Sequence, residues 1–220
     1  MSARDEVLAR VRRAKGPREV APVPREYRAA GSRGPGDVEL FAERLRDYRA
    51  RVRVVAADEV PGAVAAALRD RGARFVVTAP GAPSAWTAEW AELSDPAGRI
   101  ESRVPLGGDA REALREMLEA ADAVVTGCHV AVAETGTIVL DHDAVDQGPR
   151  ALTLVPDYHL VVVRADQVVA GVPDAVAALA GVHTQTWISG PSATSDIELE
   201  RVEGVHGPRT LEVVIVRDTA

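Results

Sequence analysis

The feature of this sequence that most constrains its fold is a repeated alternation between short aliphatic runs and helical segments. Val-rich runs such as 51–56, 74–78 and 123–126 are separated by segments with apolar residues every three or four positions. Strands that read as continuous apolar runs are typical of parallel sheets covered by helices on both faces. The alternation therefore predicts an α/β fold, a three-layer α/β/α sandwich around a mainly parallel sheet.

The same pattern places the individual elements. The expected strands are 51–56, 74–78, 100–104, 123–126, 137–141, 151–155, 159–164, 184–189 and 211–216. Four expected helices cover 2–14, 60–71, 166–179 and 195–202. Three more are expected: one with Asp37 as its cap, a short one with Ser84 as its cap, and one that begins at Asp109. Three strand-like runs follow one another between 137 and 164 without a helix, so the sheet can be mixed there, with antiparallel strands.

Composition limits the chemistry that the chain can perform by itself. Aromatic residues make up only 4% of the sequence, so the core must be built mainly from Val, Ala and Leu. Cys128 is the single cysteine, which excludes a disulfide within the chain, a four-cysteine iron–sulfur cluster and a cysteine-based zinc site. The histidines are scattered along the sequence. We therefore expect no bound metal or cofactor in this chain, and a buried structural thiol at Cys128.

Charge divides the sequence into two parts. Residues 1–33 carry a net charge of +5 and the remainder carries −12. Residues 16–36 are rich in Gly, Pro and Arg, so we assign 1–36 to an N-terminal helix with a basic linker and 37–220 to the α/β domain. The basic segment has no interleaved aromatic residues, and a solvated tail is expected in place of a nucleic-acid site. No apolar run suits a signal peptide or a membrane span, so the expected location is the cytoplasm.

The first candidate site is the stretch from Ser189 to Glu198. It leaves a β-rich run, turns through Gly and Pro, presents several hydroxyl groups and then begins an expected helix. Free backbone N–H groups at a helix N-terminus, with Ser and Thr hydroxyls beside them, can bind an anion. Ordinary helix capping, closed by Glu198, is the alternative interpretation. The candidate ligand-binding residues here are Gly190, Ser192, Thr194, Ser195 and Asp196.

The second candidate site follows the expected strand 123–126. Glu134 stands between an apolar run and Gly136, where partial burial would favour an acid, base or nucleophile. Thr135, Gly136 and Thr137 are the candidate ligand-binding residues beside it; a plain hairpin turn is the alternative. If strands 123–126 and 184–189 are parallel, their loops emerge on the same sheet edge. We therefore expect Glu134 and the 192–196 turn to form one composite site.

Three motifs occur together in a specific order. They are Ala133–Leu140, Ser189–Glu198 and Gly204–Pro208. In this order they resemble the lactate-utilisation (LUD) domain family over roughly residues 37–217. The short length and the single cysteine are similar to its lactate utilization protein C branch.

The resemblance implies a fold related to sugar-phosphate isomerases and CoA-transferases. It also implies a role in oxidising L-lactate to pyruvate together with iron–sulfur partner proteins. On this interpretation the chain is a non-redox subunit that binds a small anionic metabolite or nucleotide, within a lactate dehydrogenase complex linked to quinone or cytochrome. The iron–sulfur clusters would belong to the partners, since the cysteine clusters of longer family members are missing here.

A freestanding enzyme remains the alternative. The CoA-transferase relatives carry a nucleophilic Glu–Gly element in the region that matches Glu134–Gly136, although Thr135 intervenes in this sequence. Such an enzyme would perform sugar-phosphate isomerisation or acyl and CoA transfer with Glu134. Fold resemblance alone does not choose between these functions.

Overall fold

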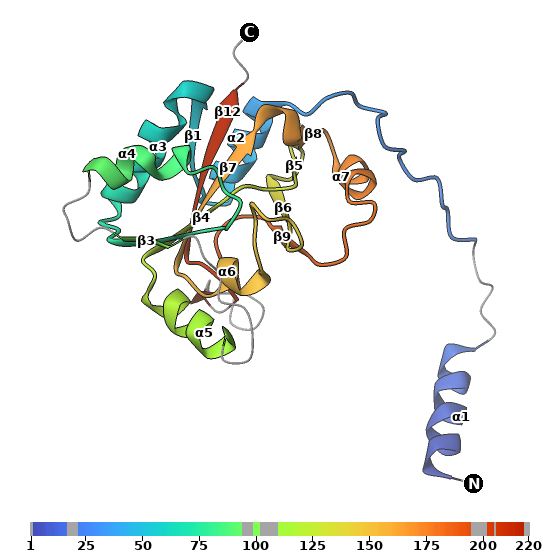
Figure 1. Ribbon diagram of the computed structural model, residues 1–220. Coiled ribbons are helices and arrows are strands. Elements are labelled where there is room, and N and C mark those ends of the chain that lie inside the picture. Colours follow the sequence, from blue (N-terminus) through green and yellow to red (C-terminus); the bar gives the residue numbers. More distant parts are fainter. Residues whose placement is uncertain are drawn as a thin grey trace.

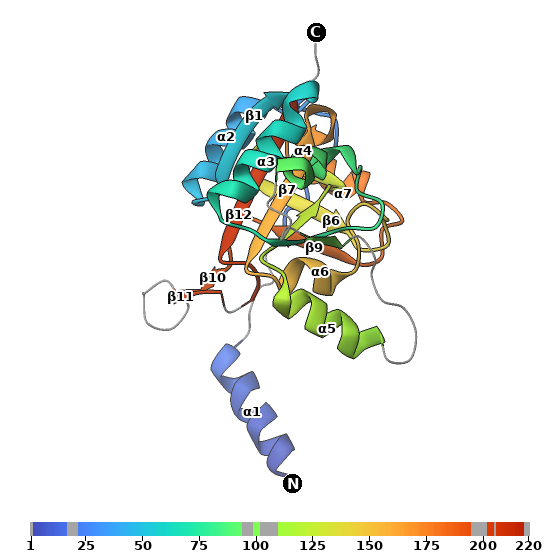
Figure 2. The same ribbon diagram turned by 60° about the vertical axis from the view of Figure 1, so that its left-hand side comes forward.

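The computed structural model describes residues 2–16, 22–93, 99–101, 110–194, 202–204 and 206–217. Six strands in this part of the chain form a parallel sheet at the centre of the molecule (Figures 1 and 2). In spatial order they are β1 (Arg51–Ala56), β12 (Thr210–Arg217), β7 (Tyr158–Arg164), β4 (Ala123–Thr126), β2 (Phe75–Thr78) and β3 (Arg99–Glu101). Every neighbouring pair is parallel, which confirms the predicted α/β fold with its mainly parallel sheet.

A second, smaller sheet packs beside the first. Its order is β8 (Val168–Val169), β5 (Val130–Val132), β6 (Thr137–Asp141) and β9 (Gln185–Ile188), and β6 is antiparallel to both of its neighbours. The antiparallel pairing expected after residue 137 is therefore present, but in a separate sheet. A short antiparallel ribbon of β10 (Ala193–Thr194) and β11 (Val202–Glu203) follows it.

Helices cover both faces of the large sheet. The α-helices are α1 (Ala3–Lys15), α2 (Val38–Asp47), α3 (Val60–Asp70), α4 (Ala85–Leu93), α5 (Ala110–Ala120), α6 (Arg150–Leu154) and α7 (Val172–Ala178). The 3-10 turns are η1 (Ala57–Glu59) and η2 (Ala165–Gln167). The Asp37 carboxylate accepts hydrogen bonds from the backbone N–H groups of Glu39 and Leu40 and caps α2, as its position in the sequence predicts.

The core is divided by the large sheet. One face of β7 and β12 packs with α3 and α4, where Val64, Leu68 and Trp90 are fully buried. The other face packs against α2 and the small sheet, through residues such as Phe41 and Ile138. Helices α5 and α6 cover the β2 and β4 side of that face, and α7 covers the outer face of the small sheet. The small sheet thus replaces helices in part of one outer layer.

Three short segments differ from the sequence prediction. Residues 151–155 were expected to be a strand, yet Arg150–Leu154 is the helix α6. The expected helix 166–179 is divided into η2, β8 and α7, and the run Val130–Val132, expected to be a loop, is the strand β5. A short apolar run suits a strand and a buried helix equally well, so packing decides between them.

The N-terminal helix α1 stands apart from the body of the molecule (Figures 1 and 2). A capping box between Ser2 and Asp5 stabilises its first turn, and none of its residues is buried. Residues 22–29 are an extended segment, and the chain joins the body at β8 through Pro35 and Gly36. Among the described helices, none is long and apolar enough to cross a membrane.

Candidate functional site

The Glu134 segment is the turn that joins β5 to β6. Residues Ala133–Gly136 form this turn, as the hairpin alternative predicts. Gly136 has a φ of 62°, and a Cβ atom there would lie 2.8 Å from the Cβ of Arg44. Only glycine tolerates both the positive φ and this close approach to α2. The turn is therefore fixed against the last residues of α2.

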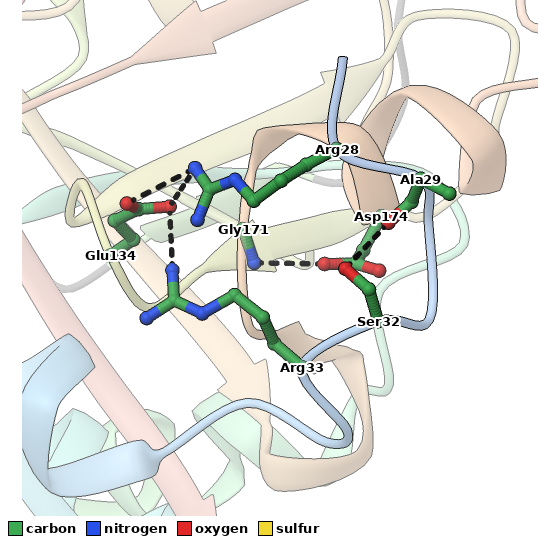
Figure 3. Close-up of polar contacts among 7 residues, drawn as sticks. All are labelled: Arg28, Ala29, Ser32, Arg33, Glu134, Gly171 and Asp174. Atoms are coloured by element: carbon green, nitrogen blue, oxygen red, sulfur yellow. Dashed lines mark hydrogen bonds and ion pairs between the residues drawn. The ribbon is translucent and has the colours of Figure 1, made fainter. Parts of the chain in front are cut away.

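The Glu134 carboxylate is held by two arginines from the N-terminal segment. Arg28 Nη2 lies 3.3 Å from both carboxylate oxygens, and Arg33 Nη1 lies 3.0 Å from Oε2 (Figure 3). The glutamate side chain is 35% exposed and the arginines are more exposed. The two guanidinium groups compensate the negative charge of the carboxylate. Because its oxygens are bonded in this way, a role as a nucleophile is disfavoured.

Other contacts hold the same segment along the edge of the small sheet. The backbone N–H of Gly31 donates to the Asp174 carboxylate, and the N–H of Gly36 donates to the Val168 carbonyl at 3.1 Å. Pro35 forms an isolated β-bridge with Val169. We call residues 28–36 the docked arm. Glu134 and Asp174 are thus the acidic side chains that receive this arm (Figure 3).

Replacing Glu134 with Gln should loosen the docked arm while leaving the stability of the domain almost unchanged. The ion pairs join half-exposed side chains, and such pairs contribute about 0–1 kcal/mol to the free energy of unfolding. Trypsin should therefore cleave after Arg28 and Arg33 faster, as mass spectrometry of a digestion time course would show. Glu116→Gln, an exposed change on α5, is the matched control. Unchanged cleavage together with lost growth on lactate would instead assign Glu134 to chemistry.

A chain of hydroxyl groups links this turn to the other candidate stretch. Thr135 Oγ1 lies 2.7 Å from Thr137 Oγ1, which lies 2.8 Å from Ser189 Oγ. Gly190 follows with a φ of 89°, and a Cβ there would lie 2.7 Å from the Cβ of Tyr48 at the end of α2. The two predicted glycines, 136 and 190, therefore let two neighbouring turns pack against the same end of α2.

A cavity with a volume of about 220 Å³ lies beyond Gly190. The end of β9, the 189–193 stretch and residues 206–208 form its walls, and His159 and Leu211 contribute from the large sheet. Both residues are near the amino ends of their strands, β7 and β12. The prediction that this stretch shares a sheet edge with the loop after strand 123–126 is therefore wrong. The reason is that β9 pairs antiparallel with β6 in the small sheet and does not belong to the same sheet as β4.

Ser192 holds the wall of this cavity together. Its N–H donates to the Pro208 carbonyl at 2.8 Å, and its carbonyl accepts from the Gly204 N–H at 3.0 Å. Its Oγ accepts from the backbone N–H of His206 at 3.1 Å. The serine predicted to bind a ligand is thus also the centre of the hydrogen bonds to Gly204, His206 and Pro208.

The structure describes only part of the remaining predicted stretch. Thr194 belongs to β10, where it pairs with Val202 of β11. Ser195 and Asp196 lie outside the described residues, as does the expected helix up to residue 201. Capping of a helix by Thr194 or Ser195 therefore stays a prediction.

The structure also separates Glu134 from Ser192. The N–H of Glu134 bonds the Ala170 carbonyl beside β8, whereas Ser192 follows β9. These two strands are the opposite edges of the small sheet, and Glu134 does not line the cavity. The expected composite site is therefore not formed. The docked arm bonds Glu134, whereas the cavity is lined by the stretch that follows β9.

Sequence reasoning missed the most unusual polar group of the cavity. His159 lies within a run of aliphatic residues on β7 and is only 1% exposed. Its Nε2 lies 2.8 Å from Thr126 Oγ1, while its Nδ1 has no hydrogen-bond partner among the described residues. Burial lowers the pKa of His159 to about 3, so the ring is neutral at physiological pH. A polar residue inside a buried strand was the signal that could have identified it.

The other candidate groups are structural. Cys128 is 1% exposed, and burial raises the pKa of its thiol to about 12, which agrees with an unreactive structural cysteine. Both ring nitrogens of His142 are bonded, to the Gly148 carbonyl and to Thr186 Oγ1. In the described parts of the chain, no three His, Cys, Asp or Glu side chains are grouped so that they could hold a metal ion.

Comparison with known proteins gives the family. The LUD domain model matches residues 38–216. A protein named lactate utilization protein C from Deinococcus radiodurans is 47% identical over 180 residues, 80% of this chain and 77% of that protein. An uncharacterised protein of Neisseria meningitidis serogroup B is 28% identical over 98% of this chain and 94% of its own length.

A solved structure supports the same relationship. The crystal structure of a DUF162 family protein from Deinococcus radiodurans superposes with a TM-score of 0.63 at 40% identity. It covers 81% of this chain and 94% of that protein. The match over residues 38–216 confirms the resemblance that the three sequence motifs predicted. From the motifs, the fold and these matches together, the chain belongs to the LUD-domain family.

Proposed function

We propose that this protein acts in lactate utilisation as a subunit without a redox centre, and that it binds a small anionic metabolite in the cavity beside Ser192. The name of the Deinococcus relative, at 47% identity, supports the metabolic role. The cavity is the observation that carries the binding role, because it combines a concave shape with a few convergent polar groups.

The size and lining of the cavity favour a small metabolite over a nucleotide. Its volume of about 220 Å³ is below the roughly 300–1,000 Å³ that is usual for larger ligands. Ser189, Ser192 and Thr186 belong to the lining, and the hydroxyl group of each also bonds a neighbour within the chain. His206 also belongs to the lining, and its ring can donate a hydrogen bond to an anion.

Electron transfer belongs to partner proteins in this proposal. Oxidation of L-lactate to pyruvate releases two electrons and two protons, and the electrons need an acceptor. The single cysteine of this chain is buried and cannot provide the ligands of an iron–sulfur cluster. We therefore assign the acceptor to iron–sulfur proteins that work with this chain in a lactate dehydrogenase complex linked to quinone or cytochrome.

The alternative, a freestanding isomerase or acyl-transfer enzyme that uses Glu134, has less support. Arg28 and Arg33 bond both oxygens of its carboxylate. A nucleophile in this position would first have to lose both ion pairs. The carboxylate is also not part of the cavity lining.

Growth and binding measured together test the proposal. A strain that lacks this chain should fail to grow on L-lactate, and the wild-type chain should restore growth. Ala193→Phe, which fills the cavity, should not restore growth, whereas Val176→Phe on the exposed face of α7 should. Calorimetry should show that wild-type protein binds L-lactate or pyruvate and that Ala193→Phe does not.

A second measurement concerns the redox assignment. The isolated chain should be colourless and should not reduce an artificial electron acceptor when L-lactate is added. Lactate oxidation by the purified chain alone would contradict the subunit proposal and favour a self-contained enzyme.

A further inference from the structure

His159 carries a buried nitrogen whose hydrogen-bonding capacity is unused. The residue lines the cavity and is 1% exposed, and its Nδ1 has no partner within the described residues. Buried polar atoms in folded proteins are almost always bonded, so each exception needs an explanation. A group supplied by a bound ligand would satisfy this nitrogen.

The neighbouring hydroxyl determines what kind of group that must be. Thr126 Oγ1 lies 2.9 Å from the Gly127 carbonyl oxygen and 2.8 Å from His159 Nε2. The hydroxyl has one proton, and the carbonyl can only accept. Both bonds are satisfied together when Thr126 donates to Gly127 and His159 Nε2–H donates to Thr126. In the neutral ring this leaves Nδ1 as an acceptor.

We infer that His159 Nδ1 accepts a hydrogen bond from a hydroxyl group of the ligand, so that the cavity selects a 2-hydroxy acid over the corresponding 2-oxo acid. This inference rests on the proposed function, which places a small organic acid in the cavity. L-lactate carries the required O–H donor at C2. Pyruvate carries a carbonyl oxygen there, and two acceptors would face each other without a proton between them.

The pairing of two strands fixes the positions of His159 and Thr126, and with them the preference for a ligand hydroxyl group. His159 lies on β7 and Thr126 lies at the end of β4, which pairs directly with β7. Both are fully buried, so water does not compete freely for Nδ1. A site built to bond a ligand hydroxyl discriminates strongly against an analogue without it, because its own buried polar atom stays unpaired. We expect an affinity for L-lactate at least about tenfold above that for pyruvate.

The first test reads the tautomer directly and needs no ligand. Nitrogen-15 NMR of the full chain with labelled histidine should show His159 with an unprotonated Nδ1 and a protonated Nε2. Thr126→Val removes the acceptor for Nε2–H and should weaken this tautomer preference, whereas Thr126→Ser should retain it. A protonated Nδ1 in the wild-type protein would overturn the inference.

The second test uses L-lactate and pyruvate as a matched pair of probes. L-lactate should shift the Nδ1 resonance and bind more tightly by calorimetry, and His159→Phe should reduce its affinity to that of pyruvate. Equal affinities for both acids in the wild-type protein would overturn the role of His159 but leave the metabolite cavity in place. Binding of neither acid would overturn both this inference and the proposed ligand.

Discussion

Replacing Arg53 with Met should lower the free energy of unfolding by about 3 kcal/mol, because it leaves a buried carboxylate without its counter-charge. Glu212 lies on β12, directly after Leu211, and is only 1% exposed. Arg53 Nε lies 2.7 Å from Glu212 Oε1, and Tyr158 Oη donates to Oε2 at 3.0 Å. The hydrogen bond with Glu212 raises the pKa of Arg53. Burial is the largest cause of the raised pKa of Tyr158, and Glu212 raises it further. The hydrogen bond from Tyr158 to Glu212 would remain in the variant. We therefore expect a loss of stability at the lower end of the range for broken buried ion pairs.

Urea unfolding of the wild type and the variant would measure this effect. Asp70→Asn is the control, because Asp70 bonds the same arginine at 2.8 Å from the exposed side and should cost less than about 1 kcal/mol. The double variant Arg53→Met with Glu212→Gln should recover much of the stability. A single Arg53→Met protein as stable as the wild type would contradict this account.

Acid should destabilise this protein through His159. The ring is neutral in the folded protein down to a pH of about 3, whereas an unfolded chain protonates histidine near about 6.5. Between these values the unfolded state binds one more proton, so the free energy of unfolding decreases as the pH falls. The slope from this residue is roughly 1.4 kcal/mol per pH unit, and the contribution is fully present above about pH 6.5.

The variant His159→Gln should remove this part of the pH dependence. Its amide group can still donate to Thr126 Oγ1, so the comparison isolates the titration of the ring. Chemical unfolding from pH 7 to pH 4 would give the slopes for both proteins. His183→Gln, an exposed change, should leave the slope as in the wild type. A wild-type slope that persists in His159→Gln would show that other groups cause the acid sensitivity.

Much of the fold follows from local patterns. The strands β1, β4 and β6 have the bounds that were predicted, and Asp37 caps α2 as expected. In these segments the apolar period, the capping residue and the flanking glycines all favour the same conformation. The same local information identified the family motifs and the two glycines, 136 and 190, whose positive φ the turns require.

Short apolar runs without a clear period were predicted less well. Residues 151–155 read as a strand but form α6, which buries Leu152 against β2 and β4. The run 130–132 was expected to be a loop, yet it pairs with both β6 and β8. In each case the conformation depends on the neighbours that the segment meets. Those neighbours come from distant parts of the chain.

From its pattern alone the sequence specified an α/β protein of the LUD-domain family with Gly190 and Ser192 in a turn beside a strand. Tertiary structure alone decided which polar groups meet. Glu134 bonds Arg28, 106 positions away, and His159 bonds Thr126, 33 positions away. The physical reason is that pairing of β4 with β7, and docking of residues 28–36 along β8, bring these side chains together. Local propensity carries no information about such pairing, because a strand's register and partners are set by the whole core.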